Sequence, residues 1–148
     1  MDEVASGLFV GTIADAGDES ALCTYDITAI VALSYDDPEG GYPSKQTIVA
    51  VPMVDGPQND PQTFGAAVQA VRSRLDAGTR ILVHCSAGAS RSPAVAATAL
   101  ALDGNRDLEE AFQQVLERRE AADPHQALVR QAARCYATLG EYTDRRKP

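Results

Sequence analysis

Short apolar runs alternate with longer amphipathic segments along the 148-residue sequence. Four runs rich in Val, Ile and Leu predict strands at Leu8–Gly11, Thr28–Leu33, Thr47–Met53 and Arg80–His84. The last three of these runs show little polar alternation, which is typical of strands buried on both faces. The pattern therefore predicts a sheet that is covered by helices on two sides.

The segments that follow these strands carry apolar residues at helical spacing. One begins at Pro61 and ends before Gly78, a residue suited to the position just after a helix. Its apolar face is expected to hold Phe64, Val68, Val71 and Leu75. Another is rich in Ala, carries Pro93 in its first turn and stops before Gly104.

Two further helices complete the predicted order. Asp107, with Glu110 three residues later, predicts a capping box at the start of one of them. Its apolar positions are Leu108, Phe112 and Val115. The last helix runs from about Pro124 to Leu139. Its inward positions are expected to be Leu128, Ala132 and Tyr136.

This order of elements predicts an α/β fold in which residues 1–148 form a single domain. We expect a mostly parallel central sheet of four to five strands, flanked by helices. Ligands of such sheets bind beyond the carboxyl ends of the strands. The loops expected at that edge are Ser34–Gln46, Val54–Asp60 and Cys85–Arg91.

The composition fits one globular domain, with 45% hydrophobic and 23% charged residues. The cysteines Cys23, Cys85 and Cys135 are odd in number and widely spaced. This spacing excludes a disulfide framework and a CxxC zinc or redox site. Cys23 and Cys135 lack a reactive setting and are expected to be packing residues.

Charge and hydropathy exclude further classes. Asp and Glu number 21 against 13 Lys and Arg, for a net charge of −8, so the basic face required for nucleic-acid binding is missing. The first residues show no secretory signal, and the longest apolar run, Ala94–Leu102, falls short of the ~20 residues that span a bilayer. We expect a cytoplasmic, monomeric protein that binds neither nucleic acid nor membrane.

The loop after the fourth predicted strand carries the strongest chemical signal. Cys85 stands at the mouth of that strand, and Arg91 follows after five intervening residues, just before a helix starts. Such a loop can turn its backbone N–H groups inward, and the helix N-terminus adds partial positive charge. Gly88 allows a backbone conformation and a close approach to a ligand that other residues prevent. Since the fork of Arg91 matches two oxygens of a tetrahedral oxyanion, the loop is predicted to bind a phosphate dianion.

The predicted phosphate-binding residues are Ser86, Ala87, Gly88, Ala89, Ser90 and Arg91. Cys85 lies at the base of the same space, where the positive field favours a thiolate placed for in-line attack on phosphorus. His84 is expected to fix the loop by hydrogen bonding and to contribute to the thiolate's environment. Ser92 can donate its hydroxyl to the sulfur and ease its departure. Because the thiolate, Arg91 and backbone amides supply the charges, no metal and no other cofactor are expected.

The segment HCSAGASRS, residues 84–92, resembles the HCxxGxxR[ST] signature of cysteine-dependent phosphatases, and that of dual-specificity phosphatases in particular. LFVG, YDITAIVAL, VPMVD, the signature and LERREAADPHQALVRQ also fall in that family's order. The resemblance covers most of the chain and implies the family's fold and a protein-tyrosine or dual-specificity phosphatase activity. One departure is His125, where the family often has Asn. His125 is expected to be a surface or packing residue rather than a catalytic one.

The mechanism also needs a group that protonates the leaving oxygen and later activates water, and one carboxyl group can do both. The segment VPMVDGPQNDP offers Asp55 and Asp60. Asp55 follows the strand directly, 30 residues before Cys85, and the resemblance also points to it. Asp60 precedes Pro61 and has an alternative interpretation as a helix N-cap. Asp55 is therefore the favoured general acid.

Small, neutral residues occupy the variable loop positions Ser86, Ala87, Ala89 and Ser90, without the extra cations that would bind several phosphates. A phosphorylated protein or peptide substrate is therefore favoured, and the resemblance implies a shallow site for phosphotyrosine, with phosphoserine and phosphothreonine as further candidates. The candidate general acid precedes the cysteine in the sequence, which disfavours low-molecular-weight phosphatases. The five-residue spacing between Cys85 and Arg91 disfavours rhodanese-type sulfurtransferases. Two alternatives stay open: a catalytically weak phosphate-recognition module and a phosphatase of a non-protein phosphoester.

Overall fold

Five strands form one sheet in the computed structural model, which describes the backbone of residues 1–146 and the side chains to residue 140. The strands are β1 (Asp2–Ala5), β2 (Leu8–Gly11), β3 (Ala29–Ala32), β4 (Thr47–Ala50) and β5 (Ile81–His84), in the spatial order β1-β2-β5-β3-β4. β1 is antiparallel to β2, and the other neighbouring pairs are parallel. The predicted α/β fold with a mostly parallel sheet is confirmed.

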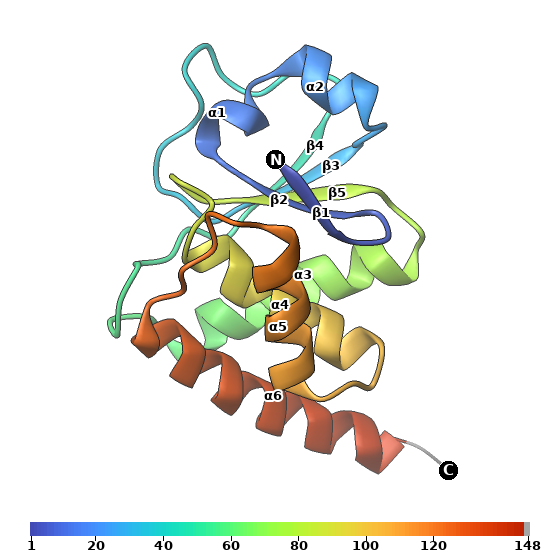
Figure 1. Cartoon of the computed structure of the whole chain (residues 1–148), viewed down its shortest axis with the longest axis vertical. Coiled ribbons are helices and arrows are strands. Elements are labelled where there is room, and N and C mark those ends of the chain that lie inside the picture. Colours follow the sequence, from blue (N-terminus) through green and yellow to red (C-terminus); the bar gives the residue numbers. More distant parts are fainter. Residues whose placement is uncertain (147–148) are drawn as a thin grey trace.

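Helices cover both faces of this sheet (Figure 1). On one side lie α1 (Ile13–Ala16) and α2 (Glu19–Thr24), and on the other lie α3 (Pro61–Asp76), α4 (Arg91–Asp103), α5 (Leu108–Arg118) and α6 (Gln126–Arg146). α4 packs against α3, α5 and α6. Nearly all residues of α4 are buried, because its many alanines let neighbouring elements approach it from every side.

Alternate residues of the central strands contribute to two cores, since successive side chains of a strand point to opposite faces. The larger core, beside α3 to α6, receives Leu8, Val10, Ala29, Val31, Ile81 and Val83. The smaller core, beside α1 and α2, receives Phe9, Ile30 and Leu82. Burial on both faces explains why β3 and β5 are continuous apolar runs in the sequence.

The four parallel strands end at the same level. Gly11 and Ala32 are both paired with His84, and Ala32 is also paired with Ala50. The residue after His84 is Cys85, so the loop with the phosphate signature leaves the sheet from its central strand. This register places the loops that follow the four strands around that point.

The prediction of a doubly buried strand over Thr47–Met53 is wrong in its end and in its burial. β4 stops at Ala50, lies at the edge of the sheet, and exposes its first and last residues. The amides of Val51 and Met53 still donate to the carbonyls of Ala32 and Leu33, at 2.8 and 3.0 Å. These two donors are two residues apart but their acceptors are consecutive, so the strands are out of register here. The regular ladder therefore ends here, and Pro52, whose backbone N faces the open edge of the sheet, needs no partner.

Two local expectations are also wrong. Asp107 caps α5 through the amide of Glu109 at 3.2 Å, and no return bond from Glu110 occurs among the described residues, so the capping box is incomplete. Cys23 is exposed on α2 rather than packed, whereas Cys135 is half-buried. Within α2, the residues three and four positions before Cys23 are Ser20 and Glu19, so the sequence gives Cys23 no apolar helix face to share.

The sequence pattern misses β1 and the end of the last helix. Two acidic residues open β1, so its four residues show no apolar run. α6 begins two residues after Pro124 and continues beyond Leu139 to Arg146. Apolar periodicity marks only the part of a helix that packs, which is why it does not reveal the full length. No helix of the described chain is both long and apolar enough to cross a membrane.

A pair of carboxyl groups makes stability depend on pH. Asp76 and Asp103 end α3 and α4, where the helix dipole already disfavours negative charge. Partial burial, followed by the hydrogen bond and the charge of Asp76, raises the pKa of Asp103 to about 6. Folding therefore favours the protonated form of Asp103 more than the unfolded chain does. The stability that this preference adds to the fold is fully present below about pH 4 and is lost as pH rises through about 6.

We expect Asp103→Asn to increase the free energy of unfolding at pH 7.5 and to flatten its pH dependence between pH 4 and pH 7. The gain should stay below about 1 kcal/mol, since exposed charge pairs are screened by solvent. Urea denaturation across this pH range measures the effect, with Glu117→Gln on an exposed position as the matched control. An Asp103→Asn profile parallel to that of the wild type would contradict the assignment.

Candidate active site

Cys85 lies directly after β5 and only 2% of it is exposed. Its Sγ is 3.1 Å from the hydroxyl of Ser92 and 3.5 Å from the amide nitrogen of the same residue. Both groups belong to the first turn of α4, which begins at Arg91. The sulfur therefore faces the positive end of a 13-residue helix, in a position where a thiolate would be stabilised.

The carbonyl groups of residues 85–89 all have partners outside the loop interior. Ser86 O accepts from the amide of Ile13 at 3.1 Å, and Ala89 O accepts from the amide of Asp123 at 2.6 Å. The carbonyls of residues 87 and 88 accept from one arginine, described below, and that of residue 85 contacts a histidine ring. Four of the five carbonyls are thus fixed by residues distant in the sequence, and that of Cys85 by its neighbour His84.

Peptide planarity converts these outer bonds into an inner surface of donors. In a trans peptide unit, the N–H points opposite to the C=O, so the amides of residues 86–90 point away from the outer partners. None of these five amides donates to another described residue. Unpaired amides of successive residues beside a helix N-terminus form an anion site. The loop thus has the donors that the sequence analysis expects of a phosphate cradle.

Gly88 is the residue that lets the loop lie against the end of β2. Its φ is +65°, and a Cβ at this position would be 2.5 Å from the carbonyl oxygen of Gly11. Such a contact with backbone cannot be relieved by moving a side chain. Any other residue would therefore displace the loop.

Arg119 is buried and fixes the middle of the loop. Its Nε donates to Gly88 O at 2.6 Å and its Nη2 to Ala87 O at 3.2 Å. Its Nη1 forms an ion pair with Asp2 of β1 at 2.9 Å. Sequence reasoning does not single out this residue, since 33 residues separate it from the cysteine and only its place in the family-like segment LERREAADPHQALVRQ could have marked it.

Arg91 spans from the loop to the segment after β4. Its Nη1 donates to Met53 O and its Nη2 to the hydroxyl of Ser86, both at 3.0 Å. The guanidinium is half-buried and carries no carboxylate partner among the described residues. Its charge is thus available to an anion in the loop.

His84 supports the loop from within the sheet. Its Nδ1 lies 3.2 Å from Cys85 O, and its Nε2 lies 2.8 Å from the hydroxyl of Tyr42. A carbonyl can only accept, so Nδ1 carries the proton and Nε2 of the neutral ring accepts from Tyr42. Burial, reinforced by the charge of Arg91, lowers the pKa of His84, which keeps the ring neutral. Tyr42 lies in one of the three predicted edge loops but carries no sequence signal of its own.

Asp55 and the phosphate-binding loop are joined through Ser90. The Ser90 hydroxyl donates to Asp55 Oδ1 at 2.5 Å and accepts from the amide of His125 at 2.8 Å. The His125 ring is exposed, and its Nδ1 accepts from the amide of Ala127 at 2.9 Å, so it caps the start of α6. A side-chain acceptor is what Asn would also supply at this position.

Asp60 lies at the other end of the same loop and caps α3. Its Oδ1 accepts from the amide of Gln62 at 2.9 Å, as its alternative interpretation requires. Asn59 next to it accepts from the amide of Val54 and donates to the carbonyl of the same residue, both at 2.7 Å. Two neighbouring residues therefore shape the loop, and Asp55 is the carboxylate that reaches the cysteine loop.

Comparisons with known proteins agree with this geometry. The model of a family described as dual specificity phosphatase, catalytic domain, matches residues 8–136. Dual specificity protein phosphatase 1 of Mus musculus is 33% identical over 127 residues, covering 83% of this chain and 34% of that protein. Dual specificity protein phosphatase 4 of Homo sapiens is 32% identical over 127 residues, covering 83% of this chain and 31% of that protein. The chain thus spans about a third of the length of these relatives.

Solved structures share the fold over nearly the whole chain. Human DUSP28 matches with a TM-score of 0.86 and 28% identity, over 96% of this chain and 99% of its own. A mouse dual specificity phosphatase complexed with zinc tungstate matches with a TM-score of 0.86 and 29% identity, over 96% and 89%. A human tyrosine phosphatase-like serine/threonine/tyrosine-interacting protein matches with a TM-score of 0.80 and 26% identity, over 94% and 97%.

We predict that Arg119→Gln weakens oxyanion binding by at least about tenfold, because two loop carbonyls lose charged donors and their peptide units can rotate. Titration calorimetry with tungstate measures the affinity at a temperature where the variant is folded. Arg118→Gln is the matched control, since Arg118 is exposed and donates, among the residues whose side chains are described, only to Val4 O, at 3.3 Å. Equal tungstate affinity in wild type and Arg119→Gln would show that the loop keeps its shape without this side chain.

Proposed function

The chain belongs to the dual-specificity phosphatase family, and we propose that it hydrolyses phosphate monoesters of protein tyrosine, serine or threonine through a phosphocysteine intermediate. The observation that supports this most directly is the set of five unpaired amides of residues 86–90 around the buried sulfur of Cys85. Together with Arg91, they offer donors on several sides of a phosphoryl group. The sulfur is then the nearest nucleophile to the phosphorus.

In the first step, Cys85 Sγ forms a bond to phosphorus while the bond from phosphorus to the substrate oxygen breaks. The phosphoryl oxygens stay on the loop amides and on the Arg91 guanidinium, which carry the charge that builds up in the transition state. The leaving oxygen takes a proton from the Asp55 carboxyl group. The dephosphorylated side chain then departs and leaves a phosphocysteine.

In the second step, water attacks the phosphorus and gives a proton to the Asp55 carboxylate. The phosphorus–sulfur bond breaks, and its electron pair returns to Cys85 as a thiolate. The Ser92 hydroxyl, 3.1 Å from the sulfur, is placed to donate a hydrogen bond to that thiolate. Inorganic phosphate leaves, and Asp55 is again protonated for the next turnover.

The bond between the Ser90 hydroxyl and Asp55 supports Asp55 as the general acid, since it ties that carboxylate to the loop that binds phosphate. Asp60 already accepts a helix amide, which occupies it in capping α3. We assign His84 to a supporting role, because its two ring nitrogens bond Cys85 O and Tyr42. It holds the peptide that leads into the loop.

The substrate class follows from what the loop lacks. Its variable residues are Ser86, Ala87, Ala89 and Ser90, and none of them adds a charge to Arg91. The loop therefore has cationic and N–H donors for one phosphate group and no side-chain cation for a second. This favours a phosphorylated protein or peptide over a multiply phosphorylated small molecule. We infer that one catalytic domain extends over residues 1–148 and acts in the cytoplasm, as a monomer, without metal, nucleic acid or membrane as partner.

Cys85→Ser should abolish hydrolysis of p-nitrophenyl phosphate, with a loss of at least about 10³-fold in kcat/KM, because a hydroxyl is a far weaker nucleophile than a thiolate. Tungstate should still bind to the variant, since the amides and Arg91 remain. Activity is measured with a chelator present. A Cys85→Ser variant that keeps its rate, or a wild type that loses activity with chelator, would exclude the thiolate mechanism. A wild type that binds tungstate but turns over no phosphopeptide would favour the recognition module.

Asp55→Asn should slow phosphopeptide hydrolysis far more than p-nitrophenyl phosphate hydrolysis. General-acid help is worth about 10²–10⁴-fold, and a leaving group of low pKa departs almost without it, whereas the tyrosine oxygen (pKa about 10) does not. The basic limb of the pH–rate profile should also flatten, because it reports an acid that must stay protonated.

The matched control for this experiment is Asp60→Asn, five residues along the same loop. It should keep the wild-type pH profile and nearly the wild-type stability, because Asn caps a helix almost as well as Asp. If Asp60→Asn loses the basic limb while Asp55→Asn retains it, the general acid is Asp60.

A further inference from the structure

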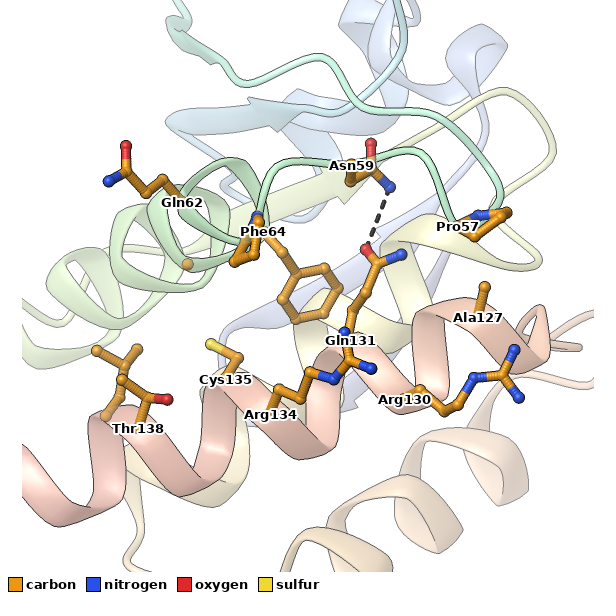
Figure 2. Close-up of a pocket in the computed structure, with 13 residues that line it drawn as sticks. Pro57, Asn59, Gln62, Phe64, Ala127, Arg130, Gln131, Arg134, Cys135 and Thr138 are labelled. Carbon is orange, nitrogen blue, oxygen red and sulfur yellow. Dashed lines mark hydrogen bonds between the residues drawn. The ribbon is translucent and has the colours of Figure 1, made fainter.

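A cavity of about 390 Å³ lies between α3, α6 and the loop that carries Asp55. Figure 2 shows Phe64 of α3 facing α6 across this space, with Arg130, Gln131 and Arg134 along the helix opposite. Its volume is within the range of small-ligand sites, roughly 300–1,000 Å³. None of its lining residues belongs to the phosphate-binding loop. It is therefore a second concave site, separate from the cradle of Cys85.

The interior of the cavity is apolar. Phe64 is 1% exposed, and its ring forms part of the wall. Burial raises the pKa of the Cys135 thiol to about 11, so this group stays neutral and behaves as a small apolar side chain. The cavity therefore favours an occupant with an apolar body.

The charged residues of the cavity are all positive. Arg130 and Arg134 line it, four residues apart on one face of α6, and no Asp or Glu lines it among the described residues. Neither guanidinium forms an ion pair within the part of the chain whose side chains are described. The chain as a whole is acidic, with 21 acidic and 13 basic residues, so a cavity lined by two arginines and no acid differs from its average charge. They supply planar forks that match a carboxylate.

We propose that this cavity binds a small amphipathic carboxylate, an aromatic or branched aliphatic acid, with its apolar body against Phe64 and its carboxylate on Arg130 and Arg134. The volume suits a single small molecule, and the charges require an anion. A protein segment would need an open groove longer than this space.

The cavity is connected to the loop of the general acid by hydrogen bonds. Gln131 lies between the two arginines in the sequence of α6; its Nε2 donates to Gly56 O at 2.9 Å and its Oε1 accepts from Asn59 at 3.2 Å. Asn59 in turn bonds the amide and the carbonyl of Val54. Gln131 and Asn59 both line the cavity. An occupant therefore touches the residues that shape the loop around Asp55, and its effect on turnover rests on the proposed function.

Binding can be tested without measuring activity. The ¹⁵N-labelled chain is titrated with indole-3-acetate, with the neutral indole-3-acetamide and with the cation tryptamine, each with and without saturating tungstate on the phosphate loop. We expect a dissociation constant of about 0.1–1 mM for the acid, as for other ligands of ~13 non-hydrogen atoms. The amide and the amine should bind at least about threefold more weakly. The backbone amides of Gly65, Thr138 and Val54 should shift, and tungstate should not displace the acid.

Variants of the lining residues locate the site. Arg130→Gln and Arg134→Gln should each weaken binding of indole-3-acetate by about two- to fivefold and leave binding of the neutral indole-3-acetamide unaffected. A Cβ at Gly65 would meet no atom within 4 Å, so Gly65→Leu should fold and place its side chain in the cavity. Binding of indole-3-acetate to this variant should be weaker by at least about tenfold. Gly65→Ala and Arg74→Gln are the matched controls, since Arg74 donates to its own helix at Ala70 O and lies outside the cavity.

Five outcomes would each contradict a part of the proposal. Equal binding of the acid, the amide and the amine would remove the role of the arginines, and unchanged binding to Gly65→Leu would remove the cavity as the site. Displacement by tungstate would place the acid on the phosphate loop instead. Tighter binding of the peptide acetyl-Asp-Leu-Glu-amide at the same amides would make a protein segment the occupant. Shifts confined to α6, without Val54, would exclude the link to the Asp55 loop. Since none of these readouts is a rate, they stand apart from the fate of the proposed phosphatase activity.

Discussion

The phosphate-binding geometry depends on the planarity of the peptide unit. The carbonyls of residues 86–89 are turned outward by partners distant in the sequence, and that of Cys85 by the ring of His84, so the amides of residues 86–90 must face the other way. The loop needs no basic side chain of its own to attract an anion, since successive N–H groups and a helix N-terminus supply the field. Arg91 adds a full charge without a carboxylate partner among the described residues, and the sulfur of Cys85 lies beside the N-terminus of α4. In the proposed mechanism, phosphate binding and activation of the nucleophile thus have the same physical cause.

The outward partners come from distant parts of the chain, which links the site to the completed fold. Ile13 follows β2, Asp123 precedes α6, and Arg119 follows α5. Arg119 also reaches the first strand through Asp2, so β1 is tied to the loop by an ion pair. Ile13 and Asp123 each restrain one peptide unit of the cradle, and Arg119 restrains two. A substitution in such a support can disturb phosphate binding without touching a residue of the phosphate signature.

The local part of this design is predictable from the sequence, and the supporting part is not. Cys85 and Arg91 are close in sequence, so strand, loop and helix signals place both residues at one sheet edge. Arg119 and Tyr42 act through tertiary contacts that no spacing reveals, since a lone Arg or Tyr usually belongs to the surface or to packing. The edge position of β4 is hidden for a similar reason: an apolar run shows that a strand is present but not which neighbours it has.

The two loops of the site differ in how firmly they are held, and that difference suits their tasks. The phosphate loop has all its carbonyls bonded and a glycine pressed against backbone, so it is pre-organised for an anion of fixed shape. The loop of Asp55 is exposed, and its contacts to the rest of the chain run mainly through side chains, notably Ser90, Asn59 and Gln131. A general acid, the role proposed for Asp55, must give up a proton in one step and accept one in the next, while leaving groups of different size pass beside it. Side-chain bonds can adjust to these changes at lower cost than a backbone ladder. Since Gln131 belongs to α6, this helix is one of the elements that hold the loop, beside the phosphate loop with its bond from Ser90 to Asp55.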